Sequence, residues 1–215
     1  FKSKKITIIK KNQDIINKCD WVFLAVTPTV GNKILSNLKF NKNKMIISFI
    51  STINLNQLKK ITGLKSNIVR AIPLPPIALC KGPVPIYPPN SKVKKFFDKL
   101  GSTVEIRNEK LSLNFWTTSA MMAPFYEILY SLSNWLIKRG IKKENAQKYI
   151  SSLFLALSED AFNHKKNLKR LVRESQTPGG LNEQAVKDLR KAGFYRLLEK
   201  TSNRIIKRLN KSQSN

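Results

Sequence analysis

The sequence predicts an α/β domain built on a parallel sheet, followed by an all-α domain, with the change near residue 108. Two observations support this prediction. In the first half, short apolar runs rich in β-branched residues alternate with polar stretches whose spacing is compatible with helices. In the second half, apolar residues recur every three or four positions, as they do along one face of a helix. We therefore expect one domain over residues 1–108 and another over residues 109–215.

The first half of the sequence contains six predicted strands. Residues 22–26 read Val-Phe-Leu-Ala-Val and are apolar at both alternations, so both faces of such a strand would be buried. That is typical of parallel strands covered by helices. The predicted strands are residues 6–9, 21–26, 45–50, 67–73, 84–87 and 104–106. Helix-like spacing between them predicts helices at residues 30–38, 55–61 and 93–100, which gives a repeating β-α-β order.

The second half reads as successive amphipathic helices. One covers residues 124–139 and stops at Gly140, a residue suited to the left-handed position after a helix. Another starts near Lys143, and a last segment, residues 182–209, is interrupted at Ala192 and Gly193. The polar tail at residues 210–215 is expected to fray. So thin a helical domain leaves apolar faces uncovered, so we expect a homodimer or a higher homo-oligomer.

The bulk composition limits the function classes. The formal charge is +27, which would ordinarily suggest a nucleic acid or an anionic membrane as partner. The excess is mostly lysine and is scattered along the sequence without a basic arm, whereas arginine is the better bidentate reader of phosphate and guanine. We interpret it as a solvated lysine surface and expect no nucleic-acid partner.

Membrane, disulfide and metal classes find no support in the sequence. Apolar runs stay far below the roughly 18 residues that span a bilayer. Cys19 and Cys80 form no disulfide or metal pattern, and His164 stands in a polar stretch without an acid or cysteine partner. The prediction is a cytoplasmic protein with no membrane partner and no metal site.

A Thr-Pro-Gly-Gly segment at residues 177–180 stands between a basic stretch and an amphipathic helix. Its glycines would let the backbone turn closely, and the following amides would point outward as donors at the positive end of the helix dipole. Such a helix start can hold a carboxylate without a cationic side chain. The alternative is an ordinary turn that begins a helix.

Four segments together resemble the pyrroline-5-carboxylate reductase family. Residues 177–182 are similar to that family's Ser-Pro-Gly-Gly-Thr-Thr, and residues 25–28, Ala-Val-Thr-Pro, to its Ala-Val-Lys-Pro. Residues 70–76 resemble its Arg-x-Met-Pro-Asn-Thr-Pro, with Leu74 and Pro75 in place of Asn and Thr. A weaker match covers residues 119–126. The resemblance runs from about Asp20 to Leu209 in the family's order.

The resemblance implies an NAD(P)H-dependent reductase of a cyclic imine carboxylate, pyrroline-5-carboxylate, which yields proline. It implies a partial Rossmann-like domain that binds NADP or NAD, followed by a helical dimerisation and substrate-binding domain. Asn182 would stand where a threonine hydroxyl meets the ring nitrogen, so it is the catalytic candidate. The candidate substrate-binding residues are Thr177, Gly179, Gly180 and Leu181; the candidate cofactor-binding residues are Ala25, Val26, Thr27, Pro28 and Pro73.

The family's Gly-x-Gly-x-x-Gly turn, which lets the cofactor pyrophosphate approach a helix, has no counterpart in this sequence. Because the chain starts at Phe1, inside what would be the first half of the dinucleotide fold, we expect it to be a fragment that lacks roughly fifty residues at its front. If it is instead a complete product, a non-catalytic homologue acting as a dimerising or binding protein is the alternative. Glu183 is expected to pair with a nearby lysine rather than to act as an acid or a base.

Overall fold

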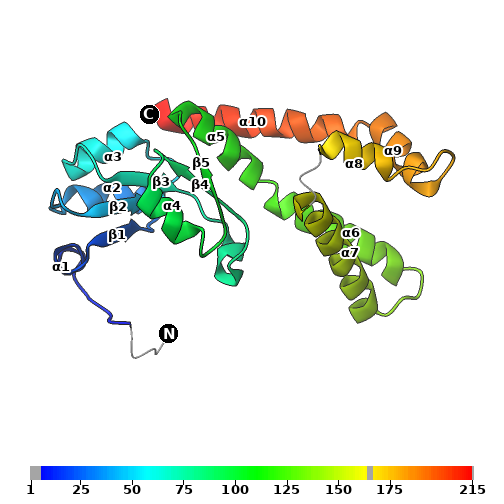
Figure 1. The fold of residues 1–215 in the computed structure, drawn as a ribbon, viewed down its shortest axis with the longest axis horizontal. Coiled ribbons are helices and arrows are strands. Elements are labelled where there is room, and N and C mark those ends of the chain that lie inside the picture. The colour runs from blue at the N-terminus through cyan, green and yellow to red at the C-terminus, as the bar shows by residue number, and fades with distance from the viewer. Residues whose placement is uncertain (1–5, 164–166, 215) are drawn as a thin grey trace. The chain divides into compact units, whose positions relative to one another are not determined.

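A computed structural model describes residues 6–163 and 167–214, apart from the side chains of residues 28, 29 and 212–214 (Figure 1). His164 therefore lies outside the described residues. The chain forms two compact units, one made of Phe1–Ser119 with Ile205–Asn215 and the other of Ala120–Arg204.

The first unit contains a five-stranded sheet. Its strands are β1 (Trp21–Leu24), β2 (Met45–Ser48), β3 (Ile68–Ala71), β4 (Pro83–Tyr87) and β5 (Ser102–Glu105), in the spatial order β1-β2-β3-β4-β5. Three of the four strand pairs are parallel, and β3 pairs with β4 antiparallel. The connection over residues 72–82 carries only the short 3-10 helix η1 (Pro75–Leu79). That is shorter than the dozen or more residues that a parallel crossover needs, so β4 reverses direction.

The strand predicted at residues 6–9 is wrong. The backbone there is irregular, and Ile8 is 87% exposed. A strand is stabilised by its hydrogen-bonding neighbour more than by the intrinsic preference of its residues. Within the described residues, β1 pairs with β2 alone, so the run at residues 6–9 has no strand beside it.

Helices cover both faces of the sheet. On one face Ile16, Leu35 and Leu58 pack with Ile46, and on the other Phe97 lies in a cluster with strand residues such as Ile47. The first face is covered by α1 (Asn12–Lys18), α2 (Pro28–Ser36) and α3 (Leu55–Thr62), the second by α4 (Ser91–Phe97). Because both faces are buried, the strands are apolar at both alternations. Helix α1 was not among the predicted helices.

The remaining helices follow the predicted breaks. They are α5 (Glu109–Ser119), α6 (Met122–Ile137), α7 (Lys143–Asn163), α8 (Leu168–Glu174), α9 (Leu181–Lys191) and α10 (Phe194–Ser214). Gly140 and Gly193 both adopt a positive φ, 88° and 76°, which confirms the two predicted stops. Frayed residues at 210–214 were predicted wrongly, because α10 continues to Ser214 once it is nucleated.

Within residues 6–163 and 167–214, no helix combines the length and the apolar character that crossing a bilayer requires.

Candidate functional site

The predicted cofactor residues gather at one edge of the sheet in the first unit. Ala25, Val26 and Thr27 follow β1, and Pro73 follows β3, with the parallel strand β2 between them. Because parallel strands end at the same edge, these segments lie along the carboxyl edge, where open α/β sheets bind their ligands. Thr27 is the N-cap of α2, and its carbonyl accepts hydrogen bonds from the amides of Val30 and Gly31. Pro28 begins α2, and its side chain lies outside the described residues.

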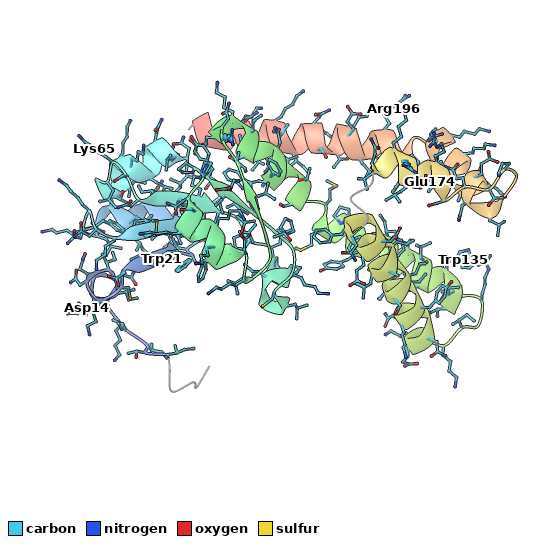
Figure 2. The ribbon with its side chains drawn as sticks, viewed as in Figure 1. Asp14, Trp21, Lys65, Trp135, Glu174 and Arg196 are labelled. Carbon is cyan, nitrogen blue, oxygen red and sulfur yellow. The ribbon has the colours of Figure 1, made fainter. Side chains whose placement is uncertain are left out.

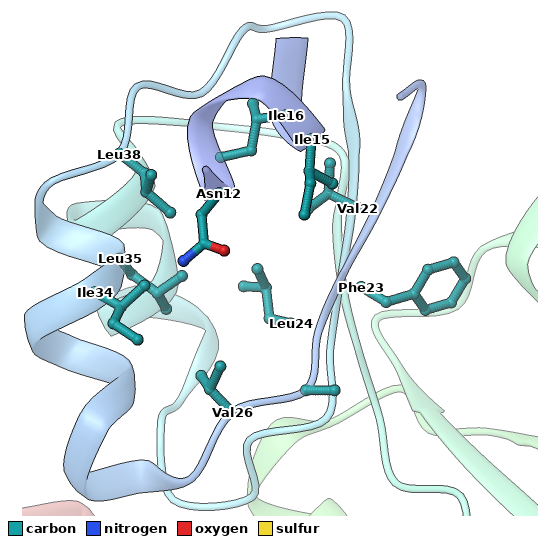
Figure 3. Close-up of a pocket in the computed structure, with 11 residues that line it drawn as sticks. Asn12, Ile15, Ile16, Val22, Phe23, Leu24, Val26, Ile34, Leu35 and Leu38 are labelled. Carbon is teal, nitrogen blue, oxygen red and sulfur yellow. The ribbon is translucent and has the colours of Figure 1, made fainter. Parts of the chain in front are cut away.

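A small apolar hollow of about 100 Å³ lies beside β1 (Figure 3). Ala25 and Val26 border it, Asn12 contributes an amide, and Phe23 points away from it. Sites for drug-sized ligands occupy about 300–1,000 Å³, so this hollow is too small for a dinucleotide. We interpret it as a packing gap between α1, β1 and α2. The lining residues are Asn12, Ile15, Ile16, Val22, Phe23, Leu24, Ala25, Val26, Ile34, Leu35 and Leu38.

A buried ion pair braces the same edge, and sequence reasoning missed it. Arg70, in β3, is 1% exposed, and its Nη1 donates to Glu109 Oε1 at 2.6 Å. The same carboxylate oxygen accepts the amide of Leu55 at 2.7 Å, at the first residue of α3. Arg70 Nη2 donates to the Ser51 carbonyl at 2.8 Å. Two side chains thus tie together β3, the loop after β2, α3 and α5, three residues before Pro73.

The Arg70 charge is held in an apolar setting. Its guanidinium lies 4.1 Å from the centre of the Trp116 ring, a cation–π arrangement. Burial lowers the pKa of Arg70 from its ordinary value, because desolvation disfavours the cation, while Glu109 acts in the opposite direction. An arginine inside the run Ile68-Val69-Arg70-Ala71 was the sequence signal for this pair, since a buried cation requires a partner.

The turn before α9, in the second unit, depends on its two glycines. Gly179 has φ 71°, a left-handed conformation that favours glycine, and Gly180 is the extended N-cap of α9. The amide of Gly180 donates to the Thr177 carbonyl at 2.8 Å. A Cβ on Gly180 would lie 2.9 Å from that carbonyl oxygen, closer than real side chains approach. The segment therefore has room for glycine at this position and for little else.

Free backbone donors follow the turn. Within the described residues, the amides of Leu181, Asn182 and Glu183 have no recorded acceptor, as is usual in the first turn of a helix. The amide of Gly179, in contrast, donates to Glu183 Oε2 at 2.9 Å, and the Asn182 side chain donates to the Ser175 carbonyl at 2.9 Å. Leu181 itself is 84% exposed. The open donors thus begin at Leu181, whereas those of Gly179 and Gly180 are engaged.

Glu183 occupies the positive end of α9. It pairs with Lys187 at 3.1 Å, which confirms the predicted lysine partner. The hydrogen bond from the Gly179 amide, followed by Lys187, lowers the pKa of Glu183 from its ordinary 4.5. One carboxylate of this chain therefore already lies beside the free donors.

This contact makes the start of α9 dependent on pH. Because the folded pKa of Glu183 lies below the unfolded one, its contribution to stability is complete above about pH 4.5 and disappears as the pH falls through the lowered value. We expect the protection factor of the Gly179 amide, which is the intrinsic exchange rate at each pH divided by the observed rate, to fall over that acid range in the parent protein. In Glu183→Gln the protection factor should change little across the same range. An equal fall in both proteins, measured by NMR, would contradict the role given to Glu183.

Known proteins resemble both halves of the chain. Residues 110–212 match the family described as pyrroline-5-carboxylate reductase dimerisation, and residues 1–52 match that described as NADP oxidoreductase coenzyme F420-dependent. Pyrroline-5-carboxylate reductase of Escherichia coli K12 is 22% identical over 201 residues, which cover 88% of this chain and 74% of that protein. The Synechocystis enzyme of the same name is 23% identical, over 90% of this chain and 75% of its own.

Solved structures share the fold. The crystal structure of Plasmodium falciparum pyrroline carboxylate reductase with NADP bound superposes with a TM-score of 0.84 at 22% identity, over 99% of this chain and 86% of that one. The Streptococcus pyogenes 1-pyrroline-5-carboxylate reductase superposes with a TM-score of 0.80 at 21% identity, over 96% and 80%. The predicted order, a Rossmann-like α/β part followed by helices, is therefore confirmed.

Proposed function

We propose that this chain is a member of the pyrroline-5-carboxylate reductase family and that it reduces pyrroline-5-carboxylate, a cyclic imine carboxylate, to proline with NADPH or NADH. The observation that carries the proposal is the start of α9, where consecutive amides lack an acceptor behind a turn that only glycines allow. Such a helix start favours a carboxylate through its dipole and its free donors. The substrate carries one carboxylate.

In the proposed mechanism, the residues at the start of α9 bind and position the substrate. The amides of Leu181 and Asn182 would hold the carboxylate, and Gly179 and Gly180 would shape the turn that exposes them. Thr177 supports this turn through its carbonyl. The Asn182 amide would exchange its contact with Ser175 for one to the ring nitrogen. Holding the ring in a single orientation supplies most of what such a site contributes to the rate.

The cofactor would bind at the edge of the sheet where β1, β2 and β3 end. Bound NAD(P)H supplies the hydride that adds to the C=N carbon. Ala25 and Val26 would offer apolar surface to a dinucleotide there, Thr27 caps the helix that follows, and Pro73 follows the end of β3. The close approach of α2 to the sheet supports this, because a Cβ on Gly31 would lie 3.3 Å from Ile50. The pair of Arg70 and Glu109 keeps the edge in place.

A direct assay tests the proposal. Purified protein should oxidise NADPH or NADH only when pyrroline-5-carboxylate is present, and the product should be identified as proline. The rival function, a non-catalytic dimerising homologue, rests on the lack of a Gly-x-Gly-x-x-Gly turn in the sequence. That rival predicts no substrate-dependent oxidation and no NAD(P)H fluorescence change on titration, while self-association persists.

Asn182 gives a test of the substrate side. Asn182→Ala removes the side-chain donor and is expected to lower kcat about 10- to 100-fold, because a positioning hydrogen bond to the ring is lost. Asn182→Thr, which places a hydroxyl at the same position, should retain more activity than Asn182→Ala. Asn203→Ala, in exposed α10, is the matched control and should leave kcat unchanged. Equal kcat in Asn182→Ala and in the control would contradict the proposal that Asn182 contacts the substrate.

Self-association belongs to the same proposal. The dimerisation domain supports homo-oligomerisation, and we propose a homodimer as its simplest form. Large apolar side chains on α6 and α7 are exposed in the single chain, including Tyr130 at 60% and Phe162 at 72%. A second copy of the chain would remove this surface from water.

A further inference from the structure

An acidic side chain of the protein itself, Glu183, lies at the helix start where the proposed function places a substrate carboxylate. Glu183 stands in the first turn of α9, and its Oε2 accepts a hydrogen bond from the amide of Gly179 at 2.9 Å. Its Oε1 lies 3.1 Å from Nζ of Lys187, one helical turn further along. The amides of Leu181 and Asn182, the proposed carboxylate donors, belong to the same turn of the helix. A bound anion and Glu183 would therefore share one end of α9.

A second acidic residue near the turn is engaged elsewhere. Glu174, labelled in Figure 2, is the last residue of α8, and its Oε1 accepts a hydrogen bond from Arg170 Nε at 2.6 Å, one turn back along the same helix. Glu183, in contrast, contacts the backbone of the turn itself, through the amide of Gly179. The negative charge that acts most directly on the turn is therefore that of Glu183.

The charge of Glu183 has two opposing effects. A carboxylate in the first turn interacts favourably with the helix dipole, and the contact with Lys187 four residues later adds a small stabilisation. The same charge repels any other anion at that end of the helix. The Glu183 side chain is 29% exposed, so water screens this repulsion incompletely. Lys187 is 66% exposed, and its hydrated cation offsets the repulsion only in part.

We propose that Glu183 determines the charge of the substrate, so that the site favours a cyclic imine with one carboxylate over a cyclic imine with two. The first carboxylate gains hydrogen bonds from the amides of Leu181 and Asn182 and a favourable interaction with the helix dipole. A second carboxylate on the same ring would add repulsion from Glu183 without gaining another helix end. This role of Glu183 rests on the proposed function, because it takes the start of α9 as the carboxylate site. Glu183 is then a specificity-determining residue and not a catalytic one.

Anion binding at low ionic strength tests the role of Glu183 without cofactor or turnover. Acetate and malonate serve as probes with one and two carboxylates, and the NMR shifts of the Leu181 and Asn182 amides report their binding. In Glu183→Gln the affinity for acetate should rise about threefold, because one repulsive charge several ångströms away in a largely aqueous setting is removed. The affinity for malonate should rise about tenfold, because the repulsion acts on both of its charges. Glu144→Gln, in the first turn of α7, is the matched control and should change neither affinity.

The partner cation provides a variant with the opposite expected sign. Lys187→Gln leaves the charge of Glu183 without its neighbour and should lower the affinity for acetate, by about threefold at most. If the pair served only to stabilise the helix start, Glu183→Gln and Lys187→Gln would both weaken acetate binding. In the reductase assay, Glu183→Gln should lower KM for pyrroline-5-carboxylate about threefold and leave kcat unchanged. Circular dichroism confirms that each variant is folded.

The outcomes distinguish the role of Glu183 from the proposed function. Imine reduction together with unchanged affinities for acetate and malonate in Glu183→Gln would overturn the role of Glu183 and leave the reductase activity in place. Equal gains for the two probes, or weaker acetate binding in both Glu183→Gln and Lys187→Gln, would overturn it as well. The expected gains without any imine reduction would support charge selection at the start of α9 and contradict the reductase activity. If acetate shifts neither the Leu181 nor the Asn182 amide in any variant, the carboxylate site and the role of Glu183 are both wrong.

Discussion

Gly180→Asp is expected to lower kcat/KM for pyrroline-5-carboxylate by at least about 100-fold, which corresponds to about 2.7 kcal/mol. Two effects combine. The new carboxylate lies next to the amides proposed to hold the substrate carboxylate, and like charges a few ångströms apart repel by several kcal/mol at reduced dielectric. The Cβ also meets the Thr177 carbonyl oxygen at 2.9 Å and displaces the turn. Steady-state kinetics and isothermal titration with proline measure the loss.

An isosteric neutral variant separates the two effects. Gly180→Asn brings the same bulk and the same close contact without the charge, so it reports the displaced turn alone. We expect Gly180→Asp to be at least about tenfold worse than Gly180→Asn, which corresponds to about 1.4 kcal/mol of repulsion. Undiminished turnover in Gly180→Asp would contradict the proposal that the substrate carboxylate binds at the start of α9. An equal loss of kcat/KM in both variants would attribute the effect to the displaced turn and would contradict a contribution from charge repulsion.

Glu109→Ala is expected to lower the free energy of unfolding by about 3–5 kcal/mol, the usual cost of leaving a buried charge without its partner. Arg70 is fully buried, so its cation would lose the 2.6 Å contact with its carboxylate partner. The Leu55 amide at the start of α3 would lose its acceptor as well. Urea denaturation followed by circular dichroism measures the change. Glu109→Gln keeps an acceptor oxygen and should cost less.

The matched control is an exposed pair of equal length. Arg170 and Glu174 also lie 2.6 Å apart, but their side chains are 59% and 37% exposed. Glu174→Ala should therefore change the free energy of unfolding by no more than about 1 kcal/mol. Similar effects at Glu109 and Glu174 would show that burial of Arg70 contributes nothing to the strength of its pair.

The parts of the candidate site that involve neighbouring residues in the chain could be predicted from the sequence. The contacts between residues distant in the chain could not. The turn at residues 177–180 and the helix that follows it involve neighbours in the chain, so their residue types predicted the structure. Which amides are already engaged was not predictable, because it depends on where the Glu183 side chain points. The bond between Arg70 and Glu109 joins positions 39 residues apart, and no local pattern encodes that distance.

The sequence by itself determined the elements with a periodic signal: five of the strands, the helices between them, and the helix stops at Gly140 and Gly193. Periodicity and glycine act within a few residues, so they survive without tertiary context. Only the tertiary structure decided that residues 6–9 form no strand, that β4 runs antiparallel to β3, and that Arg70 pairs with Glu109. These outcomes depend on which neighbour a segment or a side chain finds, and that neighbour can lie far away in the chain.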